Sequence, residues 1–512
     1  MCQVDEDFQG QLEHTEVPSI SKKCVKCKEK TAVVVIRAGD TYCRDCFREY
    51  FIHKFRAMLG KNRIIFPGEK VLLAVSGGPS SCSMLSQVQE GLSQNAHKKL
   101  RFIPGIVYID EGAAAGRSVD DRKTAMAQMQ TLFEATGFPF HLVPLEQVLD
   151  LSPSVLVMAP SPSEQPGSAY KAAVDQFIQS KGHWPPRPQD QDQDQDLDQA
   201  SLPDIQESHT QLLQQLMSST KTQTAREELL SMLRQHLLVH TARTKGYSKL
   251  MLGDCCSRLA VKLLSSIALG RGAQLAQDTG FSDSRYGDII TVRPMRDYSS
   301  KEIVFYNHMF KVPSIFIPGL DTMTADKSSI QRLTESFVTK LQADFPSTVS
   351  TIYRTSEKLQ TAWKGSCAAD VCDTCLLCLC ALDTTVENAS AFQATLISEQ
   401  LSQTKPPETS SAINPNLNPV QSNPGSALAT TTGQCCSGEG ECGKKGGGCC
   451  SSPRVPETTD MRSLLCYSCR QTVKDMSSVD HLPAYILLEA QRRNRRSQMR
   501  EQISEFILDE GV

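Results

Sequence analysis

The chain has 512 residues, of which 40% are hydrophobic and 22% charged, a composition typical of a soluble protein with a buried core. At roughly 150 residues per domain, this length predicts three or four structural units. The formal charge of −3 excludes a uniformly basic nucleic-acid coat, and no apolar run approaches the roughly 18 residues that a membrane helix needs. Residues 1–10 lack the pattern of a secretory signal, so we expect a cytoplasmic protein whose 20 cysteines are metal ligands or free thiols.

The first predicted unit, residues 21–60, follows a flexible N-terminus of residues 1–20. Two Cys-x2-Cys pairs, Cys24 with Cys27 and Cys43 with Cys46, are separated by 15 residues. This spacing predicts a zinc ribbon, in which four thiolates close a tetrahedral site and leave no position for a substrate. Four reduced buried thiols are the alternative. From Cys43 to Leu59, apolar residues recur at helical spacing, which predicts an amphipathic helix.

Residues 61–345 show alternating strand and helix patterns, which predict an α/β domain with a parallel sheet and helices on both faces. Residues 152–210 interrupt the pattern with prolines and a Gln/Asp tract, which indicate a disordered insertion. Thr224-x-x-Glu227 and Ser299-x-x-Glu302 are candidate capping boxes at helix starts. The expected strands are 71–75, 102–109, 138–144, 249–253 and 288–292, and the expected helices include 120–136, 258–269 and 329–341.

The segment Ser76-Gly77-Gly78-Pro79-Ser80-Ser81 joins the first of these strands to a helix. Backbone N–H groups and the helix dipole favour a phosphate at such a position, and the two glycines permit a close backbone approach. The loop has no lysine and no Walker spacing, so it is not an ordinary P-loop. Many turns of this composition bind nothing, so both interpretations stand.

A second group of cysteines lies toward the C-terminus. We expect residues 346–392 to contain a helix and half of a second zinc site, 393–462 to be a disordered linker, and 463–512 to contain the other half and a basic helix. The predicted ligands pair across 87 residues, and Cys372 and Cys380 compete with them. These ligands are Cys375, Cys378, Cys466 and Cys469.

Positive charge is concentrated near both ends of the chain. Residues 21–70 hold 13 Lys and Arg against 5 acidic residues, a local net charge of +8. Such patches fit a phosphate backbone, although a solvated helix face or a site for an acidic protein partner would look the same. The candidate RNA-binding residues are Lys22, Lys23, Lys26, Lys28, Arg492, Arg493, Arg495 and Arg496.

Four segments occur in an order typical of one superfamily: VLLAVSGGPSS at 71–81, VYIDEG at 107–112, LMLGD at 250–254 and TVRPMRDYSSKEIVFY at 291–306. The chain resembles the PP-loop ATP pyrophosphatase superfamily, with the adenine nucleotide alpha hydrolase-like fold. With the N-terminal cysteine pairs, LCYSCR at 465–470 and PAYILLEAQ at 483–491, it is similar to the second-subunit family of the cytoplasmic wobble-uridine tRNA thiolases.

This resemblance implies a place in a tRNA 2-thiolation complex with sulfurtransferase activity. Active members use ATP with magnesium to adenylate the C2 oxygen of the wobble uridine in tRNAs for Lys, Glu and Gln, and then replace it with sulfur. The sulfur comes from a thiocarboxylated ubiquitin-related modifier. The second subunit forms a heterodimer with a catalytic PP-loop paralogue, cytoplasmic tRNA 2-thiolation protein 1.

Three departures from the family pattern predict a chain without full catalytic residues. Ser80 stands where the SGGxDS loop has Asp, and a hydroxyl cannot replace a carboxylate that holds metal–pyrophosphate. Positions 257 and 258 are Ser and Arg where active thiolases have acidic residues. The segment before the helix at 224–243 lacks the Cys-x2-Cys of active thiolases.

Two other interpretations remain open at the sequence level. The first is an autonomous ATP-dependent tRNA sulfurtransferase, with Asp254, Cys255 and Cys256 as weak catalytic candidates and Ser76, Gly77, Gly78, Ser80 and Ser81 as the nucleotide-binding loop. A packed thiol pair at a helix start is the alternative for the two cysteines. The second is a zinc-based interaction scaffold.

Overall fold

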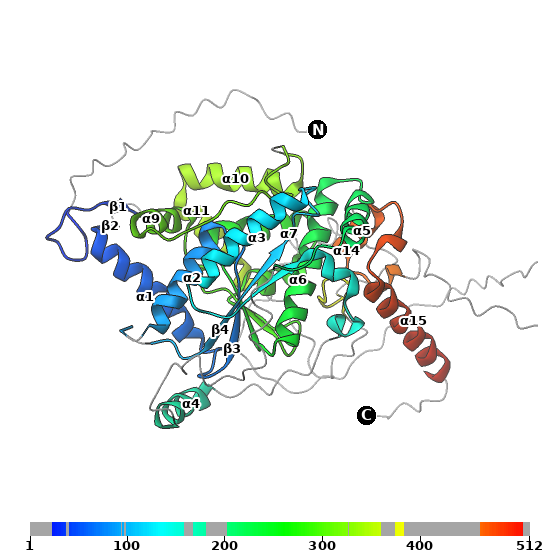
Figure 1. Cartoon of the computed structure of the whole chain (residues 1–512), viewed down its shortest axis with the longest axis horizontal. Helices are drawn as coiled ribbons and strands as arrows, with labels where there is room; N and C mark the ends of the chain where they lie inside the picture. The colour runs from blue at the N-terminus through cyan, green and yellow to red at the C-terminus, as the bar shows by residue number, and fades with distance from the viewer. Residues whose placement is uncertain are drawn as a thin grey trace, which may run out of the picture. The chain divides into compact units, whose positions relative to one another are not determined.

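The computed structural model describes residues 23–36, 40–93, 95–96, 99–157, 167–180, 202–325, 327–359, 374–382 and 461–504 (Figure 1). The predicted flexible N-terminus and all of the predicted linker except Met461 and Arg462 lie outside these residues. No described helix is both long enough and apolar enough to cross a bilayer.

A six-stranded sheet, ordered β5-β4-β3-β6-β8-β7, forms the centre of the α/β domain. All neighbouring strands are parallel except β7, which pairs antiparallel with β8. The predicted parallel α/β sheet is confirmed, and the two-residue edge strand β7 is an addition too short to leave a periodic signal. The strands are β3 (Lys70–Ala74), β4 (Ile103–Asp110), β5 (Phe140–Pro144), β6 (Lys249–Leu252), β7 (Ser282–Asp283) and β8 (Ile290–Val292).

Helices bury both faces of this sheet. In β3, Leu72 packs with Leu250 in one core, whereas the next residue, Leu73, packs with Met84 in a second core on the other face. Successive side chains of a strand point to opposite faces, so a continuous apolar run is what two covered faces require. The helices of the core around Leu73 are α1 (Arg44–Asn62), α2 (Pro79–Leu92), α3 (Val119–Glu134) and α9 (Ser300–Phe310). The helices of the core around Leu72 are α5 (Glu207–Ser218), α6 (Gln223–Thr244), α14 (Tyr467–Lys474) and α15 (Ala484–Ser504).

A third, smaller core lies beside the sheet. Leu259 of one helix packs against Val338 and Tyr353 of two helices that follow later in the chain. Short helical turns complete the domain. The helices of this core are α7 (Cys256–Ala268), α10 (Ile330–Asp344) and α11 (Pro346–Thr355). Further short elements are η1 (Leu145–Asp150), η4 (Gly272–Gln274), α8 (Leu275–Thr279), η5 (Ser356–Lys358) and η7 (Val479–His481).

One of the two predicted capping boxes is correct. Ser299 accepts a hydrogen bond from the Glu302 amide at 3.2 Å, and the Glu302 carboxylate accepts one from the Ser299 amide at 2.6 Å. At α6 the cap is Thr222, not Thr224. The Thr224 hydroxyl instead accepts from the Ile330 amide, so a tertiary contact replaces the expected local one.

The predicted disordered insertion, residues 152–210, is too long, because it includes residues that form helical elements. Its first residues form η2 (Pro153–Leu156), in which Val155 and Leu156 are buried, and its last residues begin α5. Inside it, α4 (Gly167–Ser180) is a described helix whose Tyr170 ring lies 5.4 Å from that of Phe66. The Gln/Asp tract itself lies outside the described residues.

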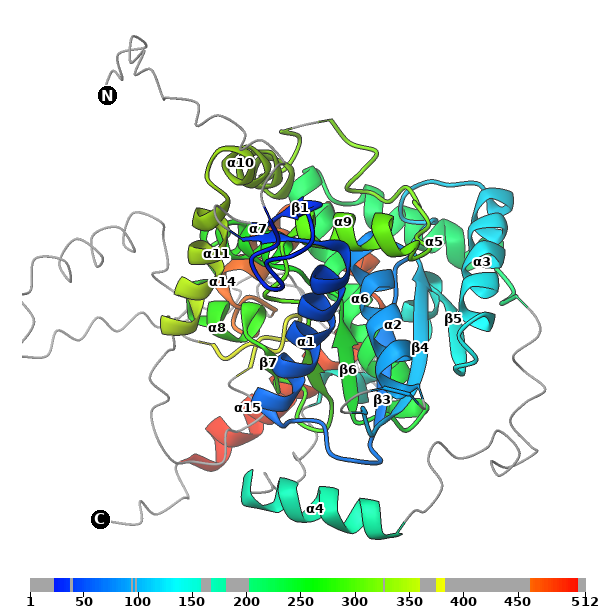
Figure 2. The same cartoon turned by 90° about the vertical axis from the view of Figure 1, so that its left-hand side faces the viewer.

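The N-terminal unit consists of a two-stranded ribbon, β1 (Val34–Val35) and β2 (Thr41–Tyr42), followed by α1. Phe47, Phe51 and Phe55 recur every four residues along α1 and are fully buried against the α/β domain. The predicted helix is therefore confirmed, and it fixes the ribbon to the domain. Figure 2 shows α1 crossing in front of the sheet.

Candidate functional site

The predicted phosphate loop lies where β3 ends and α2 begins, and its serine hydroxyls and two of its carbonyls make hydrogen bonds within the chain. The Ser81 hydroxyl accepts from the Ser76 amide at 3.2 Å and donates to the Gly78 carbonyl at 3.1 Å. Gly77 has φ +84°, which favours glycine, and a Cβ there would lie 3.0 Å from the Ile315 carbonyl oxygen. The Ile315 amide also donates to the Gly77 carbonyl at 2.8 Å. The segment containing Ile315 therefore lies directly against the loop.

Ser80, the residue that departs from the family pattern, donates its hydroxyl hydrogen to the Gly253 carbonyl. Gly253 follows β6 and sits so close that a Cβ there would lie 2.8 Å from the Ser81 Cα. The hydroxyl at position 80 thus joins the carboxyl ends of β3 and β6. An aspartate there would place a carboxylate against a carbonyl oxygen.

The acidic residues at the end of β4 are also engaged within the chain. Asp110 accepts from Arg122 Nε at 2.7 Å, and the same guanidinium donates to Glu146 at 2.9 Å. All three side chains are buried. Glu111 forms an ion pair with Arg234 of α6. The VYIDEG segment therefore contributes internal ion pairs at this edge of the sheet.

The candidates Asp254, Cys255 and Cys256 lie where β6 ends and α7 begins. Asp254 Oδ2 lies 3.5 Å from Arg293 Nε. Cys255 is buried, with its sulfur 3.6 Å from the Ser300 hydroxyl. Burial raises the pKa of the Cys256 thiol to about 12. A neutral, enclosed thiol is a poor nucleophile, so the geometry favours the packed thiol pair over a sulfur-transfer site.

The four N-terminal cysteines converge, with their sulfur atoms all within 4.8 Å of one another. The distance between Cys27 Sγ and Cys43 Sγ is 3.9 Å, close to the roughly 3.8 Å expected across a tetrahedral zinc tetrathiolate. Burial alone would raise the pKa of Cys24, but backbone hydrogen bonds from Cys27, Cys43 and Lys26 outweigh it and lower the pKa to about 6. The donor set and spacing fit a thiolate-bound metal ion.

The C-terminal ligands Cys375, Cys378, Cys466 and Cys469 converge in the same way, across 87 intervening residues. Cys378 Sγ and Cys466 Sγ lie 3.6 Å apart. Cys380 is adjacent but lies outside this group, and its sulfur accepts from Arg285 at 3.1 Å. Cys372 lies outside the described residues. Both predicted ligand sets are thus brought together, and both could hold a metal ion.

The two cysteine sites share one local design. In each, a turn carries the first Cys-x2-Cys pair and is followed by a residue with positive φ, Lys28 at 60° and Leu379 at 55°. The second pair occupies a helix start: Cys43 is the N-cap of α1, and Cys466 is the N-cap of α14. The positive end of a helix dipole favours thiolates there.

The two sites differ in how they are packed. The C-terminal site belongs to the main core, where Cys469 Sγ lies 3.8 Å from Met232 Sδ. His236 of α6 hydrogen-bonds the Leu377 carbonyl and the Tyr485 hydroxyl, both at 2.7 Å. Burial lowers the pKa of His236 to about 4, so its ring is neutral. In the N-terminal site, Cys27 and Cys46 are partly exposed.

A buried ionic network beneath the C-terminal site has no motif in the sequence. Arg285 forms hydrogen bonds or ion pairs with Asp283 and Asp278 and also donates to Cys380 Sγ. Arg293 Nη2 lies 3.7 Å from Asp283 and thereby extends the network to Asp254. Isolated charged residues carry no periodic signal, which is why neither arginine was predicted.

The candidate RNA-binding residues are distributed unevenly. Lys23, Lys26 and Lys28 are exposed on the N-terminal ribbon, and Lys22 lies outside the described residues. The prediction that Arg493 is available to bind RNA is wrong. Its side chain is buried, donates to the Thr374 carbonyl at 2.6 Å and pairs with Glu489. The exposed candidates on α15 are Arg492, Arg495 and Arg496.

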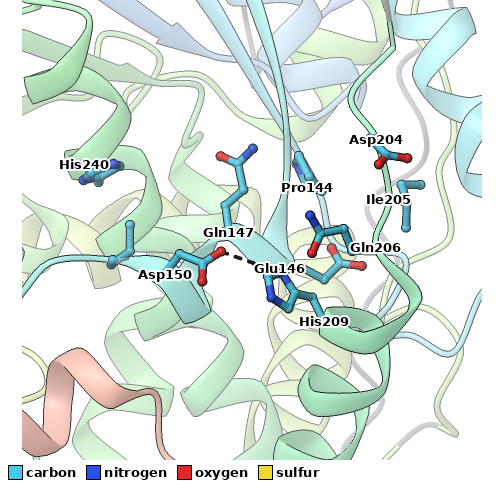
Figure 3. Close-up of a pocket in the computed structure, with 10 residues that line it drawn as sticks. Pro144, Glu146, Gln147, Asp150, Asp204, Ile205, Gln206, His209 and His240 are labelled. Atoms are coloured by element: carbon cyan, nitrogen blue, oxygen red, sulfur yellow. Dashed lines mark ion pairs between the residues drawn. The ribbon is translucent and has the colours of Figure 1, made fainter.

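Two cavities among the described residues are large enough to consider, and the phosphate loop lines neither of them. The smaller, about 340 Å³, lies where β5 ends, between η1 and α5 (Figure 3). Its Asp150 and His209 form an ion pair at 3.7 Å, and its Glu146 already binds Arg122.

Among the described residues, the two cysteine groups are the only sets of three or more His, Cys, Asp or Glu side chains that converge as metal ligands do.

The fold and these sites define an α/β protein with a modified loop after its first sheet strand and two tetracysteine centres. The sequence model of the family described as "Cytoplasmic tRNA 2-thiolation protein 2" matches residues 329–471. Proteins with this name are 58% identical in Danio rerio and 48% identical in Homo sapiens, each over 100% of this chain and 99% of the relative. The chain belongs to the cytoplasmic tRNA 2-thiolation protein 2 family.

The family name agrees with the predicted cytoplasmic location. Among solved structures, the chain is similar to the U34-tRNA thiolase NcsA from Methanococcus maripaludis with its [4Fe-4S] cluster. That similarity has a TM-score of 0.45 at 15% identity and covers 72% of this chain and 94% of that chain.

Proposed function

We propose that this chain acts in cytoplasmic tRNA 2-thiolation as the non-catalytic subunit of a heterodimer with a catalytic PP-loop paralogue. Membership of the tRNA 2-thiolation protein 2 family supports the process and implies a tRNA substrate. In this proposal the substrate is the wobble uridine of tRNAs for Lys, Glu and Gln. The paralogue adenylates that uridine, and a thiocarboxylated ubiquitin-related modifier supplies the sulfur.

The observation that carries the non-catalytic assignment is the hydrogen bond from Ser80 to the Gly253 carbonyl. The loop has a hydroxyl bonded to the Gly253 carbonyl where a metal–pyrophosphate ligand would need a carboxylate. Asp110, the last residue of the neighbouring strand β4, is paired with Arg122, and the next residue, Glu111, is paired with Arg234. The charges at this edge of the sheet are therefore neutralised within the chain.

Zinc is the metal that four thiolates in tetrahedral arrangement favour, so we assign zinc to both centres. A bound zinc would tie together the chain segments that carry its ligands. Because each set supplies four cysteines, the metal has no open position for a substrate. The proposed role of both centres is therefore structural.

The test uses the chain with and without its proposed partner. Cells lacking the chain are expected to lose 2-thiouridine from tRNA, measured by nucleoside mass spectrometry, and tagged chain is expected to co-purify a second PP-loop protein and tRNA. The chain alone should give no tRNA-dependent pyrophosphate release from ATP. Robust release by the isolated chain would contradict the non-catalytic assignment, and normal 2-thiouridine in its absence would contradict the role in thiolation.

The autonomous sulfurtransferase is the alternative, and the buried Cys255 and Cys256 argue against it. Replacing both cysteines by serine distinguishes the autonomous sulfurtransferase from the non-catalytic subunit. Thiolation should persist if the thiols only pack. Loss of thiolation with an intact heterodimer and normal unfolding would instead support sulfur transfer by this chain.

A further inference from the structure

The turn that carries the first cysteine pair of the C-terminal centre, residues 374–381, is neither helix nor strand. Within it, the Cys375 amide donates to the Cys380 carbonyl at 2.7 Å. The Leu376 amide donates at 2.8 Å to the carbonyl of Leu464, which lies two residues before the second cysteine pair. The backbone of this turn therefore connects the two halves of the ligand set.

Three side chains from different parts of the surrounding core bind carbonyl groups of this turn. His236 lies on α6, Arg285 lies between β7 and β8, and Arg493 lies on α15. His236 and Arg493 are 1% and 3% exposed, and the side chain of Arg285 is 10% exposed. A buried carbonyl without a partner is costly, so an irregular turn in a core depends on such donors. The bonds are His236 to Leu377 at 2.7 Å, Arg285 to Cys378 at 3.4 Å and Arg493 to Thr374 at 2.6 Å.

The position of the hydrogen on His236 follows from its two partners. A carbonyl oxygen can only accept, so Nε2 carries the hydrogen and donates it to Leu377. Because the buried ring is neutral, Nδ1 accepts the hydroxyl hydrogen of Tyr485 at 2.7 Å. Tyr485 of α15 therefore fixes the tautomer and the orientation of the ring that holds the turn.

The turn of the N-terminal centre is held differently. Its Lys23 carbonyl accepts from the Thr41 hydroxyl at 3.0 Å. Lys26 and Lys30 pair with acidic residues of α1, but all four of these side chains are more than half exposed. Exposed ion pairs contribute little, so we expect this turn to depend more on its metal than the buried turn does.

We propose that His236, Arg285 and Arg493 are positioning residues that hold the turn 374–381 in its metal-binding conformation before the metal binds. The C-terminal centre then releases its ion more slowly than the N-terminal centre does. Groups that orient metal ligands typically change metal affinity about 10- to 100-fold. The proposal rests on the proposed zinc assignment, because it concerns the retention of that ion.

The experiment follows the transfer of zinc from the zinc-loaded, full-length chain to a chelating dye. The unmodified chain should release its zinc in two phases of equal amplitude, with rates that differ by at least about tenfold. Cys27→Ser, which removes a ligand of the N-terminal centre, should abolish the fast phase and leave the slow one unchanged.

The positioning residues are then tested in the Cys27→Ser chain, where one phase remains. His236→Phe should accelerate zinc release about 10- to 100-fold. Tyr485→Phe keeps the buried ring and loses only the hydroxyl, so it should fold normally and accelerate release about threefold to tenfold, the equivalent of one neutral hydrogen bond.

Two control variants separate positioning from a general loosening of the core. Tyr247→Phe removes a buried tyrosine hydroxyl in the same core, beside Gly105 and His141 of the sheet. Leu230→Ala creates a cavity on α6 in that core and removes no hydrogen bond to the turn. Urea unfolding measures the stability of each variant, and neither control should change the release rate by more than about twofold.

Hydrogen exchange of the metal-free, full-length chain tests whether the turn is formed before the metal binds. The amides of Leu376 and Leu379, which donate to the Leu464 and Cys375 carbonyls, should remain protected in the unmodified chain. They should lose this protection in His236→Phe and retain it in Leu230→Ala.

Three outcomes overturn the positioning role while the zinc assignment stands: release rates that follow unfolding free energy in all variants, rates unchanged in both His236→Phe and Tyr485→Phe, or a turn unprotected in the metal-free chain. A fast phase that persists in Cys27→Ser contradicts the predicted order of release. Absence of zinc from the C-terminal centre would contradict the zinc assignment itself, and the hydrogen exchange would still decide whether the turn is preformed.

Discussion

At the scale of single residues, Arg122 binds Asp110 of the VYIDEG segment inside the core. Its guanidinium is fully buried between Asp110 and Glu146, and Thr210 donates to Glu146 at 2.8 Å. Gly112 is required beside it, because a Cβ there would lie 2.5 Å from Arg122 Cγ. The arginine therefore joins Asp110 of β4 to Glu146 of η1 through charge, and a hydrogen bond to Thr210 links it to α5.

Replacing Arg122 by methionine should lower the free energy of unfolding by about 3 to 5 kcal/mol, because two buried carboxylates lose their cation. Urea denaturation measures the change. Lys123→Met, at the adjacent exposed position, should shift the unfolding free energy by less than about 0.5 kcal/mol. Equal losses in the two variants would show that the helix, not the ion pair, is responsible.

Ser80→Asp tests whether the loop can be restored to the family pattern. The new carboxylate would face the Gly253 carbonyl oxygen, so we expect a loss of about 2 kcal/mol in unfolding free energy and no gain of pyrophosphate release. Ser80→Ala, which only removes the donor, should lose about 1 kcal/mol. A catalytically active Ser80→Asp chain would mean that one substitution separates this chain from an active enzyme.

His141 of β5 predicts a pH dependence. Burial, with Lys245 nearby, lowers its pKa from 6.5 to about 4. The unfolded chain then binds more protons, so stability is complete above about pH 6.5 and falls as the pH approaches 4. Allowing for partial exposure of the ring, we expect a contribution of about 1 kcal/mol between pH 7.5 and 5.5. His141→Phe should flatten the pH profile of the urea midpoint by this amount, and an unchanged profile would contradict the assignment.

At the scale of elements, the turn-and-helix cysteine unit occurs twice in different surroundings. The N-terminal copy rests on α1, whereas the C-terminal copy is part of the main core, with Cys469 fully buried. Loss of one ligand should therefore have different consequences at the two sites, even though the ligand geometry is the same.

Cys27→Ser and Cys469→Ser should each reduce bound zinc from about two ions per chain to about one, measured by elemental analysis. Only Cys469→Ser should also lower the unfolding free energy of the α/β domain, by more than about 3 kcal/mol, since its site orders the core. Similar losses of stability in both variants would contradict this difference in packing.

Much of this element structure was predictable. Apolar runs identified β3, β4, β5, β6 and β8, and cysteine spacing identified both ligand sets. Arg493 and Thr224 were misassigned because their partners, the Thr374 carbonyl and the Ile330 amide, are distant in sequence. The Arg285 network was not predictable for the same reason, since a buried ion pair leaves no periodicity in either partner.

At the scale of the whole molecule, the loop between β3 and α2 is a structural junction, because Ser80 bonds it to Gly253 beyond β6, and a groove of about 1290 Å³ runs along α1. These features of the described residues fit the proposed role of the chain, which is to bind and support its partner and not to react. The same scaffold can serve both purposes, because the sheet and its two covering layers do not depend on the loop chemistry.

The C-terminal cysteine centre joins residues 375–378 to residues 466–469 within one core. We therefore expect a single peptide-bond cleavage between residues 383 and 460 to give two polypeptides that remain one particle, because α14 and α15 also pack into the main core. The protein could accordingly be produced as two co-expressed fragments divided in this interval. A reporter domain inserted there would leave both cysteine pairs and α15 in their places.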